Sequence, residues 1–313
     1  MRRRGGNSLV QHHDVAVVVD SSSCLPADLL QKWNITVVPH ELIIGLRSLR
    51  DGVDIQPSEF YRLLSQDSTT KFTTAAPQPR QFLDAFISAS QQASNILCLT
   101  LSSQFSATYR SACAAATMSD GALTENPAGT TKIKVIDSKA AAGGAGLIAL
   151  AAARWASQGL SLEQVVAGVE RMSPKVNLLA YLDTLRYLSR SGRIHKMAAW
   201  AGTMLSIKPL TELKLGEARM LERPRSRAKA QERLLAVMRQ RVADRPIVVN
   251  VMEADAVEEA QKLSQRIQSE FNCREIIVSQ FTPVMGLHTG PGLLGVAFYT
   301  DDDHEDSAPG EAS

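Results

Sequence analysis

The chain has 313 residues, of which 44% are hydrophobic and 21% are charged, and its formal net charge is +2. This is the composition of an ordinary folded protein, and it excludes a chain that is disordered, collagen-like or coiled coil throughout. The length favours two domains over a single hydrophobic core. The four cysteines lie far apart, at no metal-binding or redox spacing, so we expect no disulfide framework.

The sequence predicts neither export nor insertion into a membrane. The first apolar run, VAVVV at 15–19, ends at Asp20 and is too short for a signal peptide. The longest weakly polar stretch, at 140–153, has 14 residues of mostly Ala and Gly, whereas a membrane span needs about 20 strongly apolar residues. We therefore expect a soluble, cytoplasmic protein.

Strand and helix patterns alternate from residue 14 to residue 158. They predict strands at Val15–Val19, Ile35–Pro39, Ile96–Leu101 and Ile133–Ile136, and helices near Pro26 and at Glu59–Leu64, Arg80–Ala89, Thr108–Met118 and Ala140–Ser157. The segment Thr73–Pro79 is rich in Thr, Ala and Pro and is predicted to be a loop. Alternation at this spacing predicts a mostly parallel sheet that is covered on both faces.

A second set of elements begins near Gly159. It comprises predicted helices at Leu162–Met172, Arg227–Arg241 and Ala256–Ile267, a hairpin around Lys214–Glu217, and strands at Asn177–Leu182, Ile247–Val251, Glu275–Val278 and Leu293–Tyr299. The predicted fold class is α/β, with one α/β domain at 14–158 and a second at 159–300. The segments 1–13 and 301–313 are predicted to be flexible tails.

Two motifs have both a structural and a functional interpretation. Asp20 and Asp137 each follow a predicted strand, where open α/β sheets bind ligands, but capping of backbone N–H groups is the favoured role. The run Gly144–Ala149 loosely matches a dinucleotide-binding fingerprint. Because the sequence after it stays helical, small residues that allow close helix packing explain this run better.

Common catalytic and metal-binding motifs are missing from the sequence. There is no G-x-S-x-G elbow and no phosphate loop, and His40, His195, His288 and His304 have no ligand neighbours at metal-binding spacing. The sequence therefore indicates neither a metal site nor a common type of hydrolase or nucleotide-binding enzyme.

Three loops instead collect hydroxyl groups and one imidazole. They are Thr73–Pro77, Ser102–Tyr109 and Gly286–Gly292. Neutral donors near helix N-termini suit one carboxylate or phosphate, because the hydroxyls add to free backbone N–H groups. Judged by spacing alone, capping of helices by Thr74 and Ser106 is the better interpretation.

The segment from Arg186 to Arg245 is strongly basic. It holds 15 Lys and Arg against five Asp and Glu, a local balance of +10. This charge predicts either a solvated helical face or a surface that docks an anionic partner. Tyr187 and Trp200 are the only Phe, Tyr or Trp residues in this segment. Because single-stranded nucleic acids stack their bases on aromatic side chains placed among basic ones, a nucleic-acid partner is not expected.

Nine segments, taken in order, resemble the DegV family of fatty-acid-binding proteins, which includes the lipid-binding subunits of bacterial fatty acid kinase. They are VVDSSSCLP at 18–26, VVPHELIIG at 37–45, RDGVDIQPSEFY at 50–61, TAAPQP at 74–79, SSQFSATY at 102–109, VIDSK at 135–139, LRYLSRSGRIHK at 185–196, IKPL at 207–210 and GLHTGPGLLGVAFY at 286–299. The resemblance covers nearly the whole ordered chain.

The resemblance implies two α/β domains with a long-chain fatty acid buried between them. Its carboxylate would be held by Thr74, Ser106 and His288, with Ser102 and Ser103 as secondary candidates in the same loop as Ser106. The sequence departs from the family pattern twice. Ala75 stands where the family usually has Ser, and Ala107 where it has Gly, and Ala disfavours a positive φ.

The function that the resemblance implies is that of a carrier and not of an enzyme. The chain would present the carboxylate of its fatty acid to a separate kinase subunit, which forms the acyl phosphate. Arg193 and Arg225 would dock this kinase, with transient contact to a membrane surface, and no cofactor besides the bound lipid is expected. The alternative is a phosphotransfer enzyme for a small hydroxyketone, similar to dihydroxyacetone kinases, but the sequence has no nucleotide site.

Overall fold

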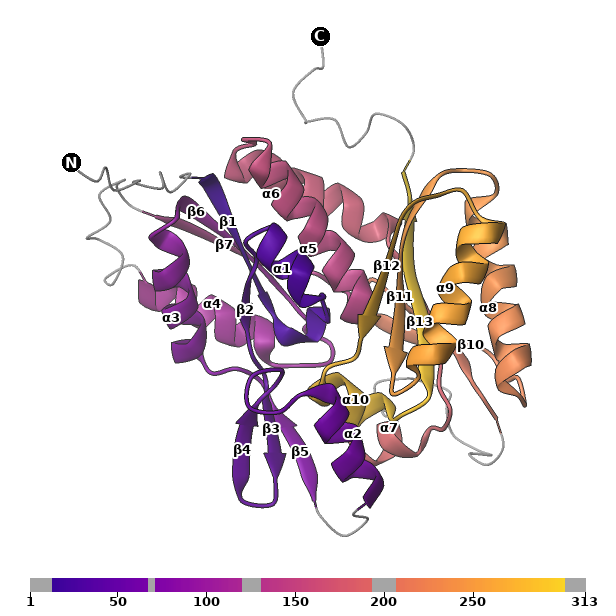
Figure 1. Cartoon of the computed structure of the whole chain (residues 1–313). Coiled ribbons are helices and arrows are strands. Elements are labelled where there is room, and N and C mark those ends of the chain that lie inside the picture. Colours follow the sequence, from indigo (N-terminus) through magenta and orange to yellow (C-terminus); the bar gives the residue numbers. More distant parts are fainter. Residues whose placement is uncertain (1–12, 67–70, 120–130, 193–206, 302–313) are drawn as a thin grey trace, which may run out of the picture.

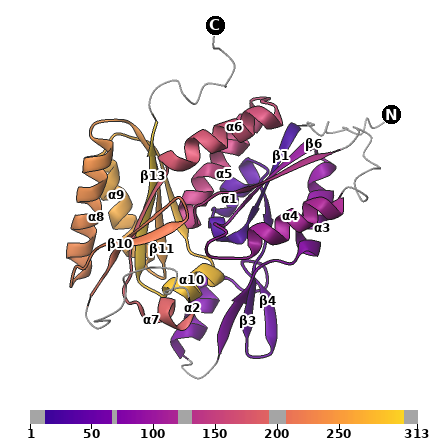
Figure 2. The ribbon, with the colours of Figure 1, turned by 180° about the vertical axis from the view of Figure 1, so that it is seen from behind.

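The computed structural model describes residues 13–66, 71–119, 131–192 and 207–301 (Figure 1). The predicted tails and Arg193 fall outside these ranges, apart from His13 and Asp301. The described part of the chain forms three sheets with helices around and between them (Figures 1 and 2). No helix in these ranges is long and apolar enough to cross a membrane.

The first sheet is parallel throughout, as predicted. Its strand order is β2 (Thr36–Val38), β1 (His13–Asp20), β6 (Ala93–Thr100) and β7 (Lys132–Asp137). Alternate residues of β1 face opposite sides, so Val17 and Val19 pack toward helix α5 (Ala142–Ser157), while Val18 packs toward α3 (Pro79–Ser90) and α4 (Thr108–Ser119). Both faces of this sheet are therefore covered by helices.

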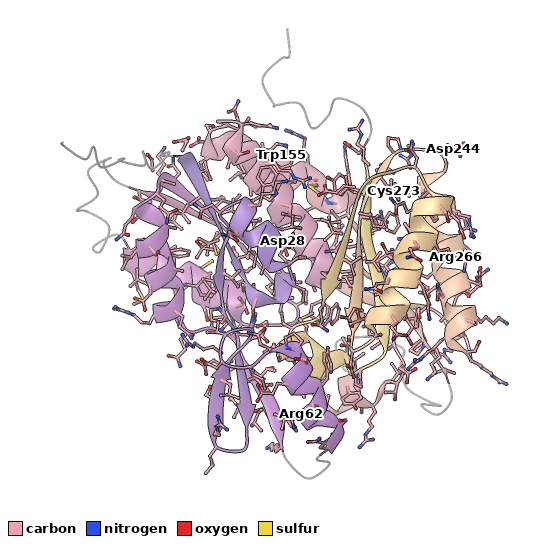
Figure 3. The ribbon with its side chains drawn as sticks, viewed as in Figure 1. Asp28, Arg62, Trp155, Asp244, Arg266 and Cys273 are labelled. Atoms are coloured by element: carbon pink, nitrogen blue, oxygen red, sulfur yellow. The ribbon has the colours of Figure 1, made fainter. Side chains whose placement is uncertain are left out.

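The second sheet has six strands and is mostly antiparallel. Its order is β10 (Glu217–Glu222), β9 (Leu210–Lys214), β8 (Asn177–Tyr181), β13 (Leu293–Thr300), β11 (Ile247–Ala254) and β12 (Cys273–Gln280), and of these pairs only β11–β12 is parallel. Helices α8 (Arg227–Val242) and α9 (Val257–Glu270) cover its outer face (Figure 2). Arg266, on the outer layer in Figure 3, forms ion pairs with Glu232 of α8 and Glu270 of α9.

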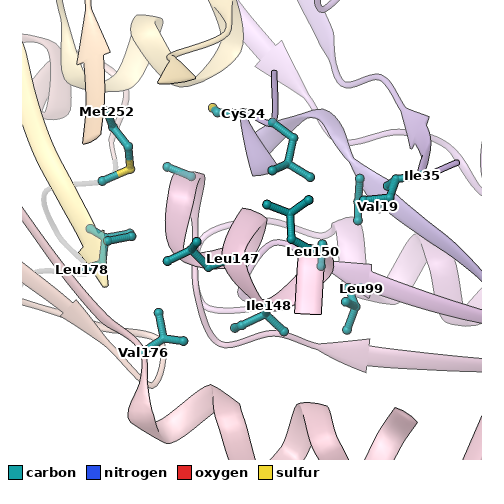
Figure 4. Packing of buried hydrophobic residues seen from close by; sticks show 14 of the residues in the cluster. Val19, Cys24, Ile35, Leu99, Leu147, Ile148, Leu150, Val176, Leu178 and Met252 are labelled. Atoms are coloured by element: carbon teal, nitrogen blue, oxygen red, sulfur yellow. The ribbon is translucent and has the colours of Figure 1, made fainter. Parts of the chain in front are cut away.

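Helix α5 lies between the two larger sheets and packs on both. Figure 4 shows Leu150 near Val19 on one side and Leu147 near Leu178 on the other. A Cβ at Gly146 would lie 2.8 Å from the carbonyl oxygen of Ser23, and a Cβ at Gly144 would lie 3.2 Å from Cδ1 of Leu178. The glycines of this run therefore allow close packing, as the sequence predicted. Helix α6 (Leu162–Met172) packs against α5.

The third sheet was not predicted. It is antiparallel, with the order β4 (Arg47–Arg50), β3 (Glu41–Ile44) and β5 (Phe72–Ala75). The prediction of a loop over Thr73–Pro79 was wrong at its start, because Thr73, Thr74 and Ala75 pair with β3. A four-residue strand depends on its partner more than on its own sequence.

Three helices lie to one side of this third sheet (Figures 1 and 2). They are α2 (Pro57–Gln66), α7 (Arg186–Arg190) and α10 (Pro283–Thr289), while α1 (Ala27–Lys32) follows β1. Helix α10 packs against α2, α7 and the third sheet. The first four residues of the predicted loop at Gly286–Gly292 belong to α10, and His288 lies in the last turn of this helix. Within the described ranges, single-turn 3₁₀ helices span Ser21–Ser23 and Ser173–Lys175.

Candidate functional site

A cavity of about 160 Å³ lies where the third sheet, helix α10 and the two larger sheets meet. Most of its wall is apolar. Leu178, Ala180 and Leu293 line it from the six-stranded sheet, and Val284 and Met285 line it from α10. The cavity is thus formed by residues on both sides of position 159.

Thr74 and His288 meet at one wall of this cavity. Thr74 is placed by the pairing of β5 with β3, and His288 by the last turn of α10. The Oγ1 atom of Thr74 lies 3.1 Å from Nε2 of His288, although the two residues are 214 positions apart in the chain. Thr74 does not cap α3, since Gln78 holds that position. The structure therefore brings together two of the side chains that the resemblance singled out.

Ser106 lies at the same cavity, in the loop that joins β6 to α4. Its Oγ accepts a hydrogen bond of 3.3 Å from the backbone N–H of Thr108 and lies 2.7 Å from Thr108 Oγ1. The capping interpretation is therefore correct for Ser106, but capping does not exclude its hydroxyl from the cavity. The three side chains that the resemblance predicts as carboxylate ligands all line one cavity.

Ser102 and Ser103 are not among the residues that line the cavity. Ser102 is buried against the hairpin between β9 and β10, where a Cβ at Gly216 would lie 3.0 Å from Ser102 Oγ. Ser103 is exposed, and its backbone N–H bonds to the carboxylate of Asp137 at 3.2 Å. The structure does not support placing these two serines at a headgroup.

The two strand-terminal aspartates both accept backbone hydrogen bonds. Asp20 caps the 3₁₀ turn at Ser22 and also accepts the N–H of Leu101 at 2.6 Å. Asp137 accepts the N–H of Lys139 at 2.9 Å in addition to that of Ser103. The structural interpretation of both aspartates is confirmed.

The two departures from the family pattern are the chain neighbours of Thr74 and Ser106. Ala75 lines the cavity beside Thr74. The backbone of Ala107 is not in the left-handed region, since its φ is not among the positive values found in the described ranges. The loop that carries Ser106 therefore has no need of a glycine at this position.

A chain of buried side chains extends from Ser106 into the protein, and the sequence did not reveal it. His40, which is 3% exposed and also lines the cavity, has its Nε2 3.0 Å from Thr108 Oγ1. Its Nδ1 lies 3.2 Å from Ser21 Oγ, and Ser21 donates a 2.6 Å hydrogen bond to Asp51. Burial raises the pKa of the Asp51 carboxyl, although hydrogen bonds from Ser21 and from the backbone of Val284 oppose this rise.

The register of a hairpin between β3 and β4 could have revealed that His40 and Asp51 lie opposite each other. Strand β3 pairs with β4 so that Glu41 opposes Arg50, and the next residues outward are His40 and Asp51. The backbone N–H of Asp51 donates to the carbonyl of His40 at 2.9 Å. A hairpin centred on Gly45 was the signal, and VVPHELIIG contains that glycine.

Much of the basic segment is neutralised by neighbouring acids. Asp183 accepts from Lys208 at 2.6 Å and from Arg227 at 2.8 Å, and Arg233 pairs with Glu222. Arg225 is exposed and has no ion pair within the described part of the chain. Ion pairs within the fold thus account for several of these charges, whereas Arg225 is exposed to solvent, which fits both a solvated face and a docking surface.

Comparisons with known proteins agree with this architecture. The model of the family described as "Uncharacterised protein, DegV family" matches residues 14–301. A DegV domain-containing protein of Caldanaerobacter subterraneus is 32% identical over 285 residues, which cover 91% of this chain and 98% of that protein.

Solved structures resemble the chain over similar lengths. A fatty-acid-binding DegV family protein of Thermus thermophilus is 30% identical with a TM-score of 0.82, and the match covers 92% of this chain and 99% of that one. A stearic-acid-binding protein of Eubacterium ventriosum is 26% identical with a TM-score of 0.83, over 91% of this chain and 98% of that one. The α/β fold, the family model and these relatives together identify the chain as a member of the DegV family.

Proposed function

We propose that this chain binds a long-chain fatty acid in the cavity, with its carboxylate at Thr74, Ser106 and His288. The observation that carries the proposal is an apolar cavity whose hydroxyl and imidazole groups come from three separate segments. Each buried CH₂ of an acyl chain contributes about 0.8 kcal/mol, so the apolar wall supplies affinity and the polar groups supply orientation. The fatty acids bound by the similar proteins of known structure support the same ligand class.

The charges at the cavity fit a single carboxylate at this site. Glu212 of β9 also lines the cavity, but its Oε1 accepts a 2.5 Å hydrogen bond from Arg241 Nη1, which offsets its charge. Thr74 and Ser106 are neutral donors, which bind a carboxylate less strongly than a buried ammonium group would. They would accommodate both the acid and its acyl phosphate.

We further propose that the chain is a carrier that acts with a separate kinase in the cytoplasm. In this proposal the domains at 14–158 and 159–300 enclose the lipid, the kinase supplies the nucleotide, and the chain releases the acyl phosphate. Arg225 and Arg193 would dock the acidic face of the kinase, with transient contact to a membrane surface. The exposure of Arg225 and the charge of its segment support this step.

Replacing Arg225 with Glu should reduce formation of acyl phosphate by a cognate kinase while leaving fatty-acid affinity unchanged. The apparent KM for the loaded carrier should rise, because a charge of the wrong sign weakens the encounter of the two proteins. Screening acts over about 8 Å at physiological salt, so added salt should narrow the difference between variant and parent. The assay follows phosphate transfer from labelled ATP at several salt concentrations.

Arg171→Glu is the matched control. Arg171 is exposed in the last turn of α6, which lies at the end of the molecule opposite α7 and α10 (Figure 1). It carries the same change of charge and should behave like the parent. If Arg225→Glu lost fatty-acid binding, or were phosphorylated as well as the parent at every salt concentration, docking through Arg225 would be wrong.

A further inference from the structure

The buried side chains beyond Ser106 form one continuous hydrogen-bonded line. Ser106 Oγ lies 2.7 Å from Thr108 Oγ1, which lies 3.0 Å from His40 Nε2. His40 Nδ1 lies 3.2 Å from Ser21 Oγ, and Ser21 donates to Asp51 at 2.6 Å. We call these five residues the relay. It connects a group that faces the cavity to a carboxyl that is 2% exposed.

The direction of every hydrogen bond in the relay follows when Asp51 is a carboxylate and His40 is neutral. A carboxylate only accepts, so Ser21 donates to Asp51, and its oxygen accepts from Nδ1–H and the backbone N–H of His40. Nε2 is then the unprotonated nitrogen and accepts from the hydroxyl of Thr108. Thr108 has one hydrogen, so Ser106 must donate to Thr108. In this state the hydrogen of Ser106 points away from the cavity.

One additional proton reverses the cavity end of the relay. If His40 takes it, Nε2–H donates to Thr108, Thr108 donates to Ser106, and the hydrogen of Ser106 becomes available to a ligand. If Asp51 takes it, Asp51 donates to Ser21, Ser21 donates to Nδ1, and Nε2–H again donates to Thr108. Both placements of the proton leave Ser106 as a donor toward the cavity. Its oxygen then accepts from Thr108 Oγ1 and from the backbone N–H of Thr108.

We propose that His40 is a positioning residue which, by gaining a proton within the relay, turns the hydroxyl of Ser106 toward the carboxylate of the bound fatty acid. This inference rests on the proposed function. Binding of one carboxylate is therefore coupled to the uptake of about one proton, and raising the pH weakens binding by up to tenfold per pH unit.

Two acidic side chains lie close to His40. Asp20 Oδ1 lies 3.7 Å from Nδ1, and Asp51 is one hydroxyl away. Cys24, which is buried near both aspartates, stays a neutral thiol because burial raises its pKa to about 12. His288 faces the cavity from α10, and α4 contributes Thr108, which does not titrate. A proton gained by the relay therefore lies close to two carboxyl groups.

Calorimetric titration of delipidated protein with decanoate tests the coupling. At one pH, the titration is carried out in several buffers of different ionisation enthalpy, and the dependence of the measured heat on this enthalpy gives the number of protons taken up. The series is repeated at values between about pH 6 and about pH 8. The parent should take up about one proton per decanoate somewhere in this range. His40→Gln should bind with an uptake near zero and with an affinity that no longer depends on pH. His288→Asn should bind decanoate more weakly, because His288 lines the site, but each decanoate that binds should still take up the proton, because the relay does not pass through His288.

Thr108 provides a second route if His40→Gln fails to fold. Thr108→Val breaks the relay between His40 and Ser106 and should abolish the uptake, whereas Thr108→Ser keeps a hydroxyl and should restore it. The inference would be overturned if the parent took up no proton, or if the uptake survived in His40→Gln or Thr108→Val. It would also be overturned if His288→Asn bound decanoate without proton uptake. Decanoate that binds without proton uptake leaves the proposed function standing, whereas failure of decanoate and palmitate to bind at all counts against the proposed function itself.

Discussion

Replacing Ser106 with Ala should weaken fatty-acid binding by about 10- to 100-fold. A hydrogen bond to a charged group contributes roughly 1.5–3 kcal/mol, and the carboxylate would lose this donor. Ser106 also accepts the backbone N–H of Thr108, so the variant should lose about 1 kcal/mol of unfolding free energy as well. Thr74→Val keeps the β-branched shape that suits strand β5 and removes only the hydroxyl, so it should weaken binding by a similar factor with less loss of stability.

Neighbours of the same residue type provide the controls. Thr73→Val alters an exposed threonine on strand β5 beside Thr74. Ser103→Ala alters an exposed serine in the loop that carries Ser106. Neither residue lines the cavity. Both controls should bind like the parent. Fatty-acid titrations beside thermal melts separate the two roles. If Ser106→Ala and Thr74→Val bound normally and only melted early, these side chains would be structural and the carboxylate site would lie elsewhere.

Gly290→Ala should destabilise the protein by about 3 kcal/mol or more. Gly290 ends helix α10 with φ +78° and ψ 168°, a conformation that is essentially restricted to glycine and costs other residues about 1–3 kcal/mol. A Cβ there would also lie 2.1 Å from Cδ2 of Tyr187 in α7, so the two helices would have to separate. Because His288 is two residues away, fatty-acid affinity should fall in the same variant.

Gly159→Ala provides a comparison without a steric clash. Gly159 has φ +84°, but a Cβ at that position would meet no atom within 4 Å, and the residue does not line the cavity. Its loss of stability should therefore stay at about 1–2 kcal/mol, and its fatty-acid affinity should match the parent. Urea unfolding of both variants gives the comparison. Equal destabilisation by the two substitutions would mean that the close approach of α10 to α7 contributes nothing to the free energy of unfolding.

The elements with strong local patterns could be predicted from the sequence. The run of valines predicted strand β1, the alternation of strands and helices predicted a parallel sheet, and the small residues of α5 predicted close packing; all three are confirmed. The third sheet could not be predicted in the same way. Its strand β5 is short and contains no long apolar side chain after Phe72, and it forms because β3 offers it a partner.

The candidate site came from the resemblance more than from residue spacing. Spacing alone favoured helix capping for Thr74 and Ser106, which is correct for Ser106 and wrong for Thr74. The contact of Thr74 with His288 joins two segments that are 214 positions apart in the chain, and no local pattern predicts such a contact. Metal-binding spacing does not single out His40, because its closest polar partners are hydroxyl groups and not further metal-ligating side chains.

Mass spectrometry of lipids extracted from the purified, denatured protein tests the central claim most directly. An apolar cavity that stays empty forfeits the van der Waals contacts that an acyl chain would restore, so protein produced in bacteria should retain a fatty acid. We predict about one fatty acid per chain, and less in a double variant that combines Ser106→Ala with Thr74→Val. Recovery of no acyl chain from the parent, together with no rise in its melting temperature when fatty acid is added, would contradict the account.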